Sequence, residues 1–208
     1  MKKIFIPLFV TIVTIFSFAQ KENEFRASMG IDFVSVPKLK VYLESISGES
    51  QSDFNSAINF SGSYGRMISP NSQMELELGY LLSSFNFNVG DGNYDLTYSI
   101  LMPSALYNYV LSGSGYNFKF GGGIGPRFLT STEKLLPFNN DYSKIGIGFL
   151  LRAVGNTAIA ENVYAHIGAD VRYDVLGKPD ENATGNKIGN VDFSSLSFGV
   201  RLGISYQF

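Results

Sequence analysis

The last thirteen residues, Leu196-Ser197-Phe198-Gly199-Val200-Arg201-Leu202-Gly203-Ile204-Ser205-Tyr206-Gln207-Phe208, alternate strictly between apolar and polar positions. A period of two over this length predicts a β-strand with one apolar and one polar environment. The apolar face continues to the final aromatic residue, although chain ends in water usually fray. The polar face has Gly, Ser, Gln and a single Arg, which suits a narrow lumen. We therefore interpret this stretch as the closing strand of a transmembrane β-barrel, with lipid outside and a polar filling inside.

The composition limits the classes of protein to which the chain can belong. Its 208 residues have the length of one domain, and its formal net charge of −2 gives no electrostatic reason to expect nucleic acid as a partner. The chain contains no Cys, which excludes disulfides, thiolate chemistry and a lipidated N-terminal cysteine.

The N-terminal segment has the pattern of a cleaved secretory signal. Two lysines precede the apolar run Ile4 to Phe18, and Ser17-Phe18-Ala19 has the pattern of a small-residue cleavage site. The run is shorter than the ~20 residues that a membrane-spanning helix needs. We expect residues 1–19 to be removed and residues 20–208 to form one outer-membrane barrel domain. No other stretch is long and apolar enough for a helical span, so a chain that enters the membrane must form a closed barrel.

Seven further segments show the same alternation. With the last strand they predict an all-β, eight-stranded, antiparallel up-and-down barrel. The segments are 25–33, 58–64, 74–82, 94–102, 116–125, 144–153 and 163–174.

Two irregularities interrupt this pattern. Leu81 is an apolar exception on the polar face. The apolar parity also changes near Phe85 and Phe87, which predicts either a β-bulge or the start of a loop. Pro103 lacks a backbone N–H, so we also expect a local distortion of the sheet there.

The connections between the segments alternate in length. Long or intermediate loops are expected at 36–53, 88–93, 131–142 and 177–190, and short turns at 69–72, 112–115 and 156–162. Short turns on one side and longer loops on the other are typical of outer-membrane barrels. An even number of strands places both termini on the short-turn side, which is the periplasm.

The chain resembles the small OmpA/OmpX-type outer-membrane barrels, and most closely a barrel-domain family abundant in Bacteroidota. The residues that carry the resemblance are Leu202 to Phe208, Leu101-Met102-Pro103 before Tyr107-Asn108-Tyr109, and the glycine-rich run Gly121 to Gly125. The resemblance implies a Gram-negative outer-membrane location, and it assigns no catalytic residue. We expect no cofactor. The resemblance also implies that the terminal strand, with Leu202, Ile204, Tyr206 and Phe208, is the signal for the barrel-assembly machinery.

The polar parity predicts a network of charges inside the barrel. Seven acids and seven bases would point inward, and equal numbers favour a salt-bridged plug because buried ions must be paired. The acids are Glu24, Asp32, Glu75, Glu77, Asp95, Asp170 and Asp174, and the bases are Arg26, Lys119, Arg127, Lys144, Arg152, Arg172 and Arg201.

The sequence contains no clear catalytic or metal site. Glu75 and Glu77 could hold a cation or act as an acid/base pair, but lumen arginines are the plainer partners. His166 is the only histidine, and we expect it to lie in the lumen rather than to act as a base.

We expect a non-enzymatic outer-membrane barrel with a plugged polar lumen, whose loops serve envelope structure or surface interaction. Its partners would be outer-membrane lipid, the assembly machinery and a surface partner bound by loop 36–53, where Lys38, Lys40, Tyr42 and Glu44 mix charge with aromatic surface. The alternatives are a small passive, porin-like channel, an envelope-lipid-modifying enzyme, and a secreted soluble barrel with its apolar face inside.

Overall fold

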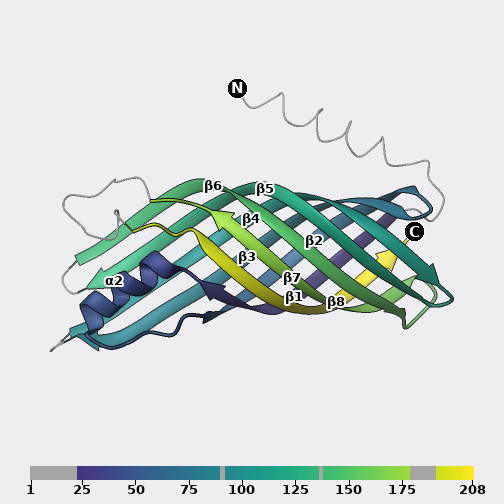
Figure 1. Cartoon of the computed structure of the whole chain (residues 1–208). Helices are drawn as coiled ribbons and strands as arrows, with labels where there is room; N and C mark the ends of the chain where they lie inside the picture. Colours follow the sequence, from purple (N-terminus) through teal and green to yellow (C-terminus); the bar gives the residue numbers. More distant parts are fainter. Residues whose placement is uncertain (1–22, 90–91, 136–137, 179–190) are drawn as a thin grey trace, which may run out of the picture.

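The computed structural model describes residues 23–89, 92–135, 138–178 and 191–208. The expected leader, 1–19, and most of the expected loop 177–190 lie outside these residues. The described chain forms eight strands and one helix (Figure 1). In chain order they are β1 (Asn23–Ser35), α2 (Pro37–Ser47), β2 (Asn55–Ser69), β3 (Ser72–Val89), β4 (Gly92–Gly113), β5 (Tyr116–Leu135), β6 (Phe138–Ala158), β7 (Val163–Val175) and β8 (Ser195–Gln207).

The strands form a closed antiparallel barrel in sequence order, with β1 paired to β8. The predicted fold class, an eight-stranded up-and-down barrel, is confirmed. Followed once around the barrel, the register leads from Glu24 to Val34, ten residues further along β1. This stagger tilts the strands, and an eight-stranded barrel leaves an interior about wide enough for side chains to fill.

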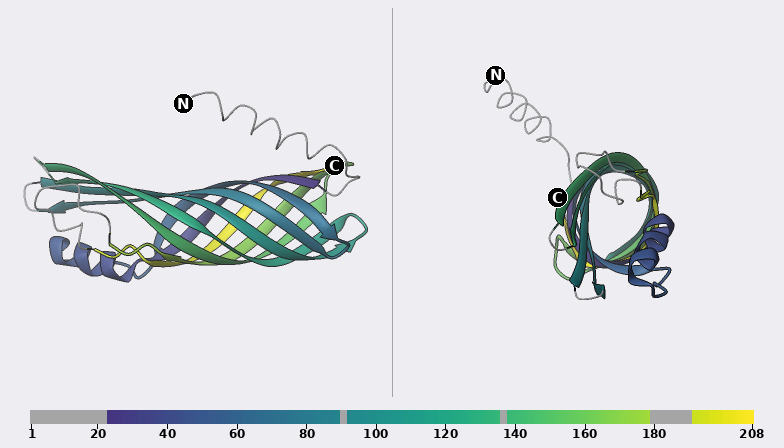
Figure 2. Two further views of the ribbon diagram at one scale, coloured as in Figure 1. Left: turned by 90° about the horizontal axis from the view of Figure 1, so that it is seen from above. Right: turned by 90° about the vertical axis from the view of Figure 1, so that its left-hand side faces the viewer.

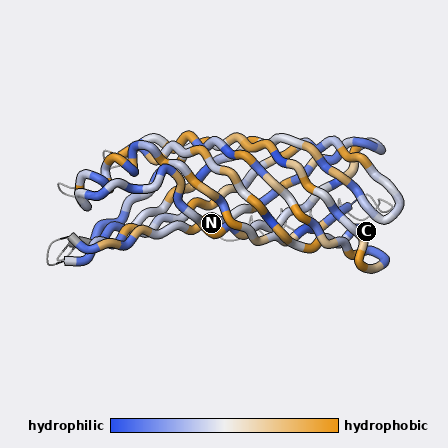
Figure 3. The backbone as a smooth tube through the Cα atoms, turned by 60° about the horizontal axis from the view of Figure 1, so that its bottom comes forward, coloured by the Kyte–Doolittle hydropathy of each residue, from blue (hydrophilic) through white to orange (hydrophobic). Residues whose placement is uncertain are grey.

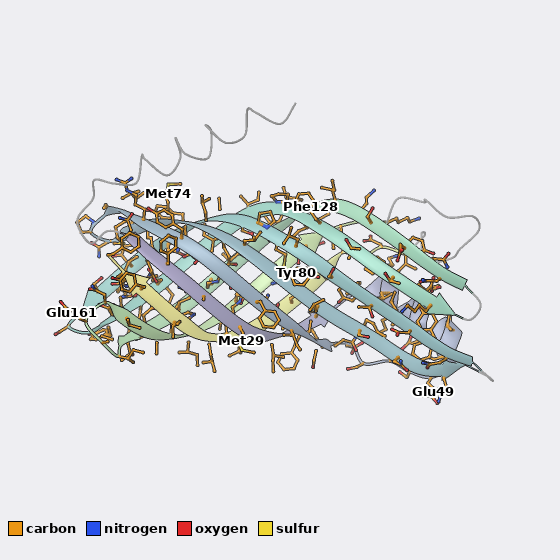
Figure 4. The ribbon with its side chains drawn as sticks, turned by 180° about the vertical axis from the view of Figure 1, so that it is seen from behind. Met29, Glu49, Met74, Tyr80, Phe128 and Glu161 are labelled. Carbon is orange, nitrogen blue, oxygen red and sulfur yellow. The ribbon has the colours of Figure 1, made fainter. Side chains whose placement is uncertain are left out.

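Apolar side chains cover the outside of the barrel, and polar ones fill most of the inside. Figure 3 shows the resulting alternation of hydropathy along the strands, and Figure 4 shows Met29, Tyr80 and Phe128 on the outer wall. Met29 is 58% exposed, whereas Glu24 and Arg201 are buried. This orientation is the reverse of that in a soluble lipid-binding barrel, so that alternative is wrong. No helix among the described residues is long and apolar enough to cross a membrane.

The two ends of the barrel differ. At one end lie the short turns, and there the backbones of Asn23 and Phe208 pair through two hydrogen bonds of 3.0 and 2.9 Å. At the other end β3, β4, β5 and β6 extend further than the other strands, since β2 pairs with β3 only as far as Leu82 and β7 pairs with β6 only from Ile147. Helix α2 lies at this end, beside the mouth of the barrel (Figure 2).

Two expected loops are regular structure instead. Residues 36–53 contain α2, which begins at a proline suited to the first turn and ends at Gly48 with a left-handed φ of 70°. Residues 131–142 belong largely to β5 and β6, whose pairing continues to Leu135 and Phe138. The polar composition of both segments suits a surface end of the molecule but does not exclude helix or strand.

The β-bulge or loop start expected near Phe85 and Phe87 is wrong. The pairing of β3 with β4 runs without a shift from Ser72 to Val89, and Leu81 and Phe85 are buried on the same parity as Glu75. The interior of the barrel changes from polar to apolar beside Leu81 and Phe85. Apolar residues therefore take the inward positions of β3 there, and the strand keeps its alternation.

The distortion expected at Pro103 is present. The pairing of β4 with β5 lacks partners between Leu101 and Ala105, although the register is the same on both sides of the gap. A side chain at Gly125 would collide with the carbonyl oxygen of Pro103. Glycine therefore allows β5 to approach β4 closely at the point where the proline provides no ladder hydrogen bond.

Candidate functional site

The lumen nearest the short turns is filled by paired charges. Glu24 on β1 accepts hydrogen bonds from Arg26 at 3.2 Å and from Gln73 on β3 at 3.0 Å, and it pairs with Lys119 on β5. Arg26 also donates to Glu75 at 3.3 Å. These contacts join strands that are not neighbours in the sheet, so opposite charges meet across the interior.

Two bidentate ion pairs occupy the middle of the lumen. Arg152 on β6 donates to both carboxylate oxygens of Glu77 on β3, at 2.5 and 2.7 Å. Arg201 on β8 holds Asp170 on β7 in the same way, at 2.8 and 3.0 Å, and reaches Glu77 at 3.3 Å. Bidentate pairs between guanidinium and carboxylate groups are among the strongest hydrogen-bonded contacts in proteins. These contacts connect β3, β6, β7 and β8 across the centre of the barrel.

A third group of charges lies toward the α2 end. Arg172 donates to Asp174 at 2.8 Å and to Asp32 at 3.0 Å. Arg127 donates to the other oxygen of Asp174 at 2.6 Å and is fully buried. Asp32 also accepts from Asn59 at 2.7 Å. Each carboxylate in this group has at least two donors, as a buried charge requires.

Most of the predicted inward charges are buried in the lumen, as six acids and six bases whose formal charges cancel. They are Glu24, Asp32, Glu75, Glu77, Asp170, Asp174, Arg26, Lys119, Arg127, Arg152, Arg172 and Arg201. The expectation for Asp95 is wrong: it lies on the outer side of β4, because its neighbours Tyr94 and Leu96 face the interior. Lys144 lies on the inward side of β6 beyond this set and is only partly buried.

Glycines in the wall make room for the buried charges. A side chain at Gly148 would collide with the guanidinium of Arg127 and the carboxylate of Asp174. A side chain at Gly199 would collide in the same way with Asp32. The alternation of small and large inward residues thus determines where the ion pairs can lie.

Between the charges and the α2 end, the lumen contains an apolar core that the sequence analysis missed. It combines α2 with the inner face of the long strands and with two residues before β8. Its buried members are Val34, Val36, Leu39, Leu43, Ala57, Leu81, Phe85, Tyr94, Leu96, Tyr98, Ile100, Met102, Leu129, Tyr142, Leu176, Val191 and Phe193. Tyr98 packs edge-on against Phe193, with ring centroids 5.9 Å apart. Tyr94, Leu96, Tyr98, Ile100 and Met102 were expected to face lipid, and that expectation is wrong.

A buried carboxylate attaches α2 to this core. One oxygen of Glu133 on β5 accepts hydrogen bonds from Tyr42 on α2 at 2.7 Å and from Tyr94 on β4 at 2.8 Å. Burial, together with the hydrogen bond to Glu133, raises the pKa of Tyr42 above its ordinary value, so its hydroxyl remains a donor. Tyr42 therefore faces the core and is not a free contact residue.

His166 lies in the lumen near Arg26 and Arg152, as its position on the polar face of the strand predicted. Its Nε2 atom is 2.9 Å from the Ser28 hydroxyl. Its Nδ1 atom has no hydrogen-bond partner among the described residues. This pair adjoins a cavity of about 10 Å³, which is too small for a substrate. A wider polar cavity of about 180 Å³ opens at the short-turn mouth beside Glu24 and Lys119.

The described residues contain no cluster of three or more His, Asp or Glu side chains placed to hold a metal ion. Glu75 and Glu77, considered as a cation site, are instead engaged by arginines. Glu75 pairs with Arg26, and Glu77 pairs with Arg152.

The predicted assembly residues form the outward face of β8. Leu202, Ile204 and Tyr206 are 59%, 59% and 48% exposed on the barrel wall. The ring of Phe208 stacks on Phe25 at a centroid distance of 5.4 Å. The terminal aromatic residue thus lies at the seam between the first and last strands.

No family model matches the chain, and no curated protein matches it. Solved structures match in fold. The attachment invasion locus protein Ail of Yersinia pestis gives a TM-score of 0.53 at 15% identity, over 90% of this chain and 99% of Ail. Neisserial surface protein A gives 0.51 at 14% identity, over 89% of this chain and 97% of that protein. The outer membrane protease OmpT of Escherichia coli gives 0.52 at 10% identity, over 92% and 98% of the two chains.

At these identities the likeness shows the fold alone. The chain has the fold of the outer-membrane β-barrels, in agreement with the resemblance to OmpA/OmpX-type proteins. The narrower resemblance to the Bacteroidota family stays a prediction.

Proposed function

We propose that the protein is an integral outer-membrane β-barrel without enzymatic activity, whose plugged lumen makes it a rigid support for a surface-exposed α2 end. The observation that carries this proposal is the filling of the lumen by three groups of ion pairs and, above them, by an apolar core under α2. A solute path would have to separate paired charges that are buried in the barrel. The continuous apolar outer wall supports a position in lipid.

The orientation follows from the two ends. Outer-membrane barrels have short turns on the periplasmic side, so the end with the short turns and both termini would face the periplasm. The end with α2 would then face the cell exterior, after export with the predicted signal segment. Ail and Neisserial surface protein A are named for attachment and for the cell surface, which supports a role in surface interaction.

The surface available to a partner is the solvent face of α2. Lys38, Val41 and Ser45 are exposed on it, while Leu39 and Leu43 are buried. Lys40 is held by Asp53 at 2.5 Å and faces Glu44 at 3.8 Å. The surface that we propose for partner contact is therefore the side of α2 with Lys38, Val41 and Ser45, and not the whole of residues 36–53.

The absence of enzymatic activity is proposed from the position of the Ser28–His166 pair. A hydroxyl and an imidazole at hydrogen-bond distance can act as nucleophile and base, but this pair faces the interior beside a cavity of about 10 Å³. A lipid-modifying enzyme needs such groups at the lipid face or at an outer opening.

Planar bilayers test the plug. The purified barrel should show no stable single-channel conductance, because paired charges and the apolar core fill its lumen. Heat-dependent gel mobility of the same preparation verifies that the inserted protein is folded. Reproducible ion-selective channels that change with Arg201→Ala or Glu77→Ala would instead establish a passive channel.

A further inference from the structure

A small cavity lies in the lumen beside the Ser28–His166 pair. Its volume is about 10 Å³, and it is lined by Arg26, Ser28, Arg152, Val154, His166, Gly168, Asp170 and Arg201. A single water needs roughly 10–15 Å³ measured in this way. The cavity therefore has room for one small solute.

Three of the lining residues carry buried nitrogen atoms without partners. Arg26 Nε, Arg152 Nε and His166 Nδ1 have no hydrogen bond to any described residue. The three residues are only 7%, 7% and 5% exposed. The terminal nitrogens of both arginines are bonded to carboxylates, so each Nε–H is a spare donor that cannot lose its proton.

The third donor follows from the contact of His166 with Ser28. If the Ser28 hydroxyl donates to Nε2, the imidazole proton lies on Nδ1, and this N–H is the group left unpaired. A buried polar group without a partner is costly, and one explanation of such a group is an ordered water or ion. The shared ligand must be an acceptor, since all three groups are donors.

We propose that this cavity binds a single halide ion, chloride under ordinary conditions, through Arg26, Arg152 and His166. A water oxygen accepts two hydrogen bonds, which leaves one of the three donors unpaired, whereas a monatomic anion accepts from all three. Asp170 is the one acid on the cavity wall, and its two oxygens already accept Nε–H and Nη2–H of Arg201. The cavity wall therefore has three arginines and one acid, and the carboxylates that pair with Arg26 and Arg152 do not line it.

Crystals of the barrel grown with bromide in place of chloride test the site directly. An anomalous bromine peak is expected between Arg26, Arg152 and His166. The variant Val154→Leu fills the cavity without changing a charge and should abolish the peak. Val110→Leu is the matched control, because Val110 lines the separate cavity at the short-turn mouth. Density without an anomalous peak would identify a water and overturn the proposal.

A solution measurement covers the case in which crystals of the variant do not form. Unfolding in urea is followed at constant ionic strength while chloride replaces gluconate. Above the dissociation constant, a tenfold increase in chloride should raise the folded-to-unfolded ratio about tenfold. Val154→Leu should remove this dependence and Val110→Leu should retain it. A wild-type barrel that is equally stable in both salts would contradict a halide site.

Discussion

Glu77 on β3 accepts two hydrogen bonds from Arg152 on β6, so two strands that are not neighbours are joined through the middle of the barrel. Glu77 also accepts from Arg201. The substitution Glu77→Gln removes the bidentate countercharge of Arg152 in a buried site and leaves it only Glu75 at 3.5 Å, whereas Arg201 keeps Asp170. Removing one partner of a buried ion pair typically costs about 3–5 kcal/mol, and we expect a loss of this size in the free energy of unfolding, measured with urea in lipid or detergent.

Asp95→Asn is the control for that experiment. Asp95 was expected in the same network but lies on the outer side of β4. Its substitution should change the free energy of unfolding by no more than ~0.5 kcal/mol. Equal losses for the two variants would mean that the loss in Glu77→Gln does not come from the lumen ion pairs.

Gly148→Ala tests the small residues opposite the buried charges. The added methyl group would displace Arg127 from Asp174, and overpacking of this kind costs roughly 1–3 kcal/mol. Gly62→Ala adds the same methyl group to the outer wall, where no atom lies within 4 Å. Thermal unfolding of both variants should show a lowered midpoint for Gly148→Ala alone. A similar shift in both would point to backbone conformation as the cause.

Val200→Arg tests the outer wall. Val200 is 52% exposed on β8, and an arginine near the middle of a bilayer costs about 2–4 kcal/mol. Val41→Arg makes the same change on α2, where Val41 is 64% exposed and water is the expected solvent. Refolding into vesicles should be impaired only for Val200→Arg. Spin labels at the two positions add a second readout, and water contact at position 200 would refute the lipid-facing assignment.

Leu43→Ala tests how α2 is held on the barrel. Leu43 is 1% exposed in the apolar core, and truncation of a buried leucine costs about 2–5 kcal/mol. Hydrogen exchange should become faster in residues 37–47, while the amides of β1 and β8 keep their protection. Val41→Ala, on the solvent face of the same helix, should leave exchange unchanged. Loss of protection throughout the barrel would mean that α2 does not unfold as a separate unit.

Phe208→Asp tests the terminal strand as an assembly signal. The ring of Phe208 contacts Phe25 at the seam, and the charge would replace this contact with a solvated group. We expect much less folded, protease-resistant barrel in cells. Ile159→Asp is the control, since Ile159 is 62% exposed in a turn at the same end of the barrel. If both variants fold to the same extent in cells, the signal lies elsewhere in the chain.

The barrel itself could be predicted from the alternation in eight segments. Wherever the lumen is polar, the apolar positions of a strand face outward and the polar positions face inward. The same rule placed the charges of β1, β7 and β8 on the inner face, where Arg26, Arg172 and Arg201 lie. Individual pairs could not be predicted, because they depend on register. Arg201, for example, reaches Glu77 only through the stagger that accumulates around the barrel.

The facing of the side chains in the part of the barrel next to α2 was mispredicted for a physical reason. Apolar was equated with outside, but α2 covers the inner face of the long strands and makes that region a water-excluded core. The available signal was Leu81, which lies on the polar parity and is fully buried. If the alternation of β4 had been continued without a break through Pro103, from the outward Tyr107 and Tyr109, it would also have predicted that Tyr98 faces the interior. Glu133 was missed because its segment was taken for a loop.

The buried charges also bear on the order in which the chain folds. Arg172 meets Asp32 across 140 residues of sequence, and Arg201 meets Glu77 across 124. The hairpin of β7 and β8 already brings Asp170 to Arg201 and Asp174 to Arg172. The contacts with Asp32 and Glu77, however, cannot form within any hairpin of consecutive strands. Until β8 reaches β1, arginines of the C-terminal strands lack acids contributed by the N-terminal ones. The ion-pair network therefore makes closure of the barrel cooperative. A sheet that closes in the wrong register keeps unpaired charges in its lumen. The free-energy cost of these buried charges destabilises the misfolded barrel and favours its reopening.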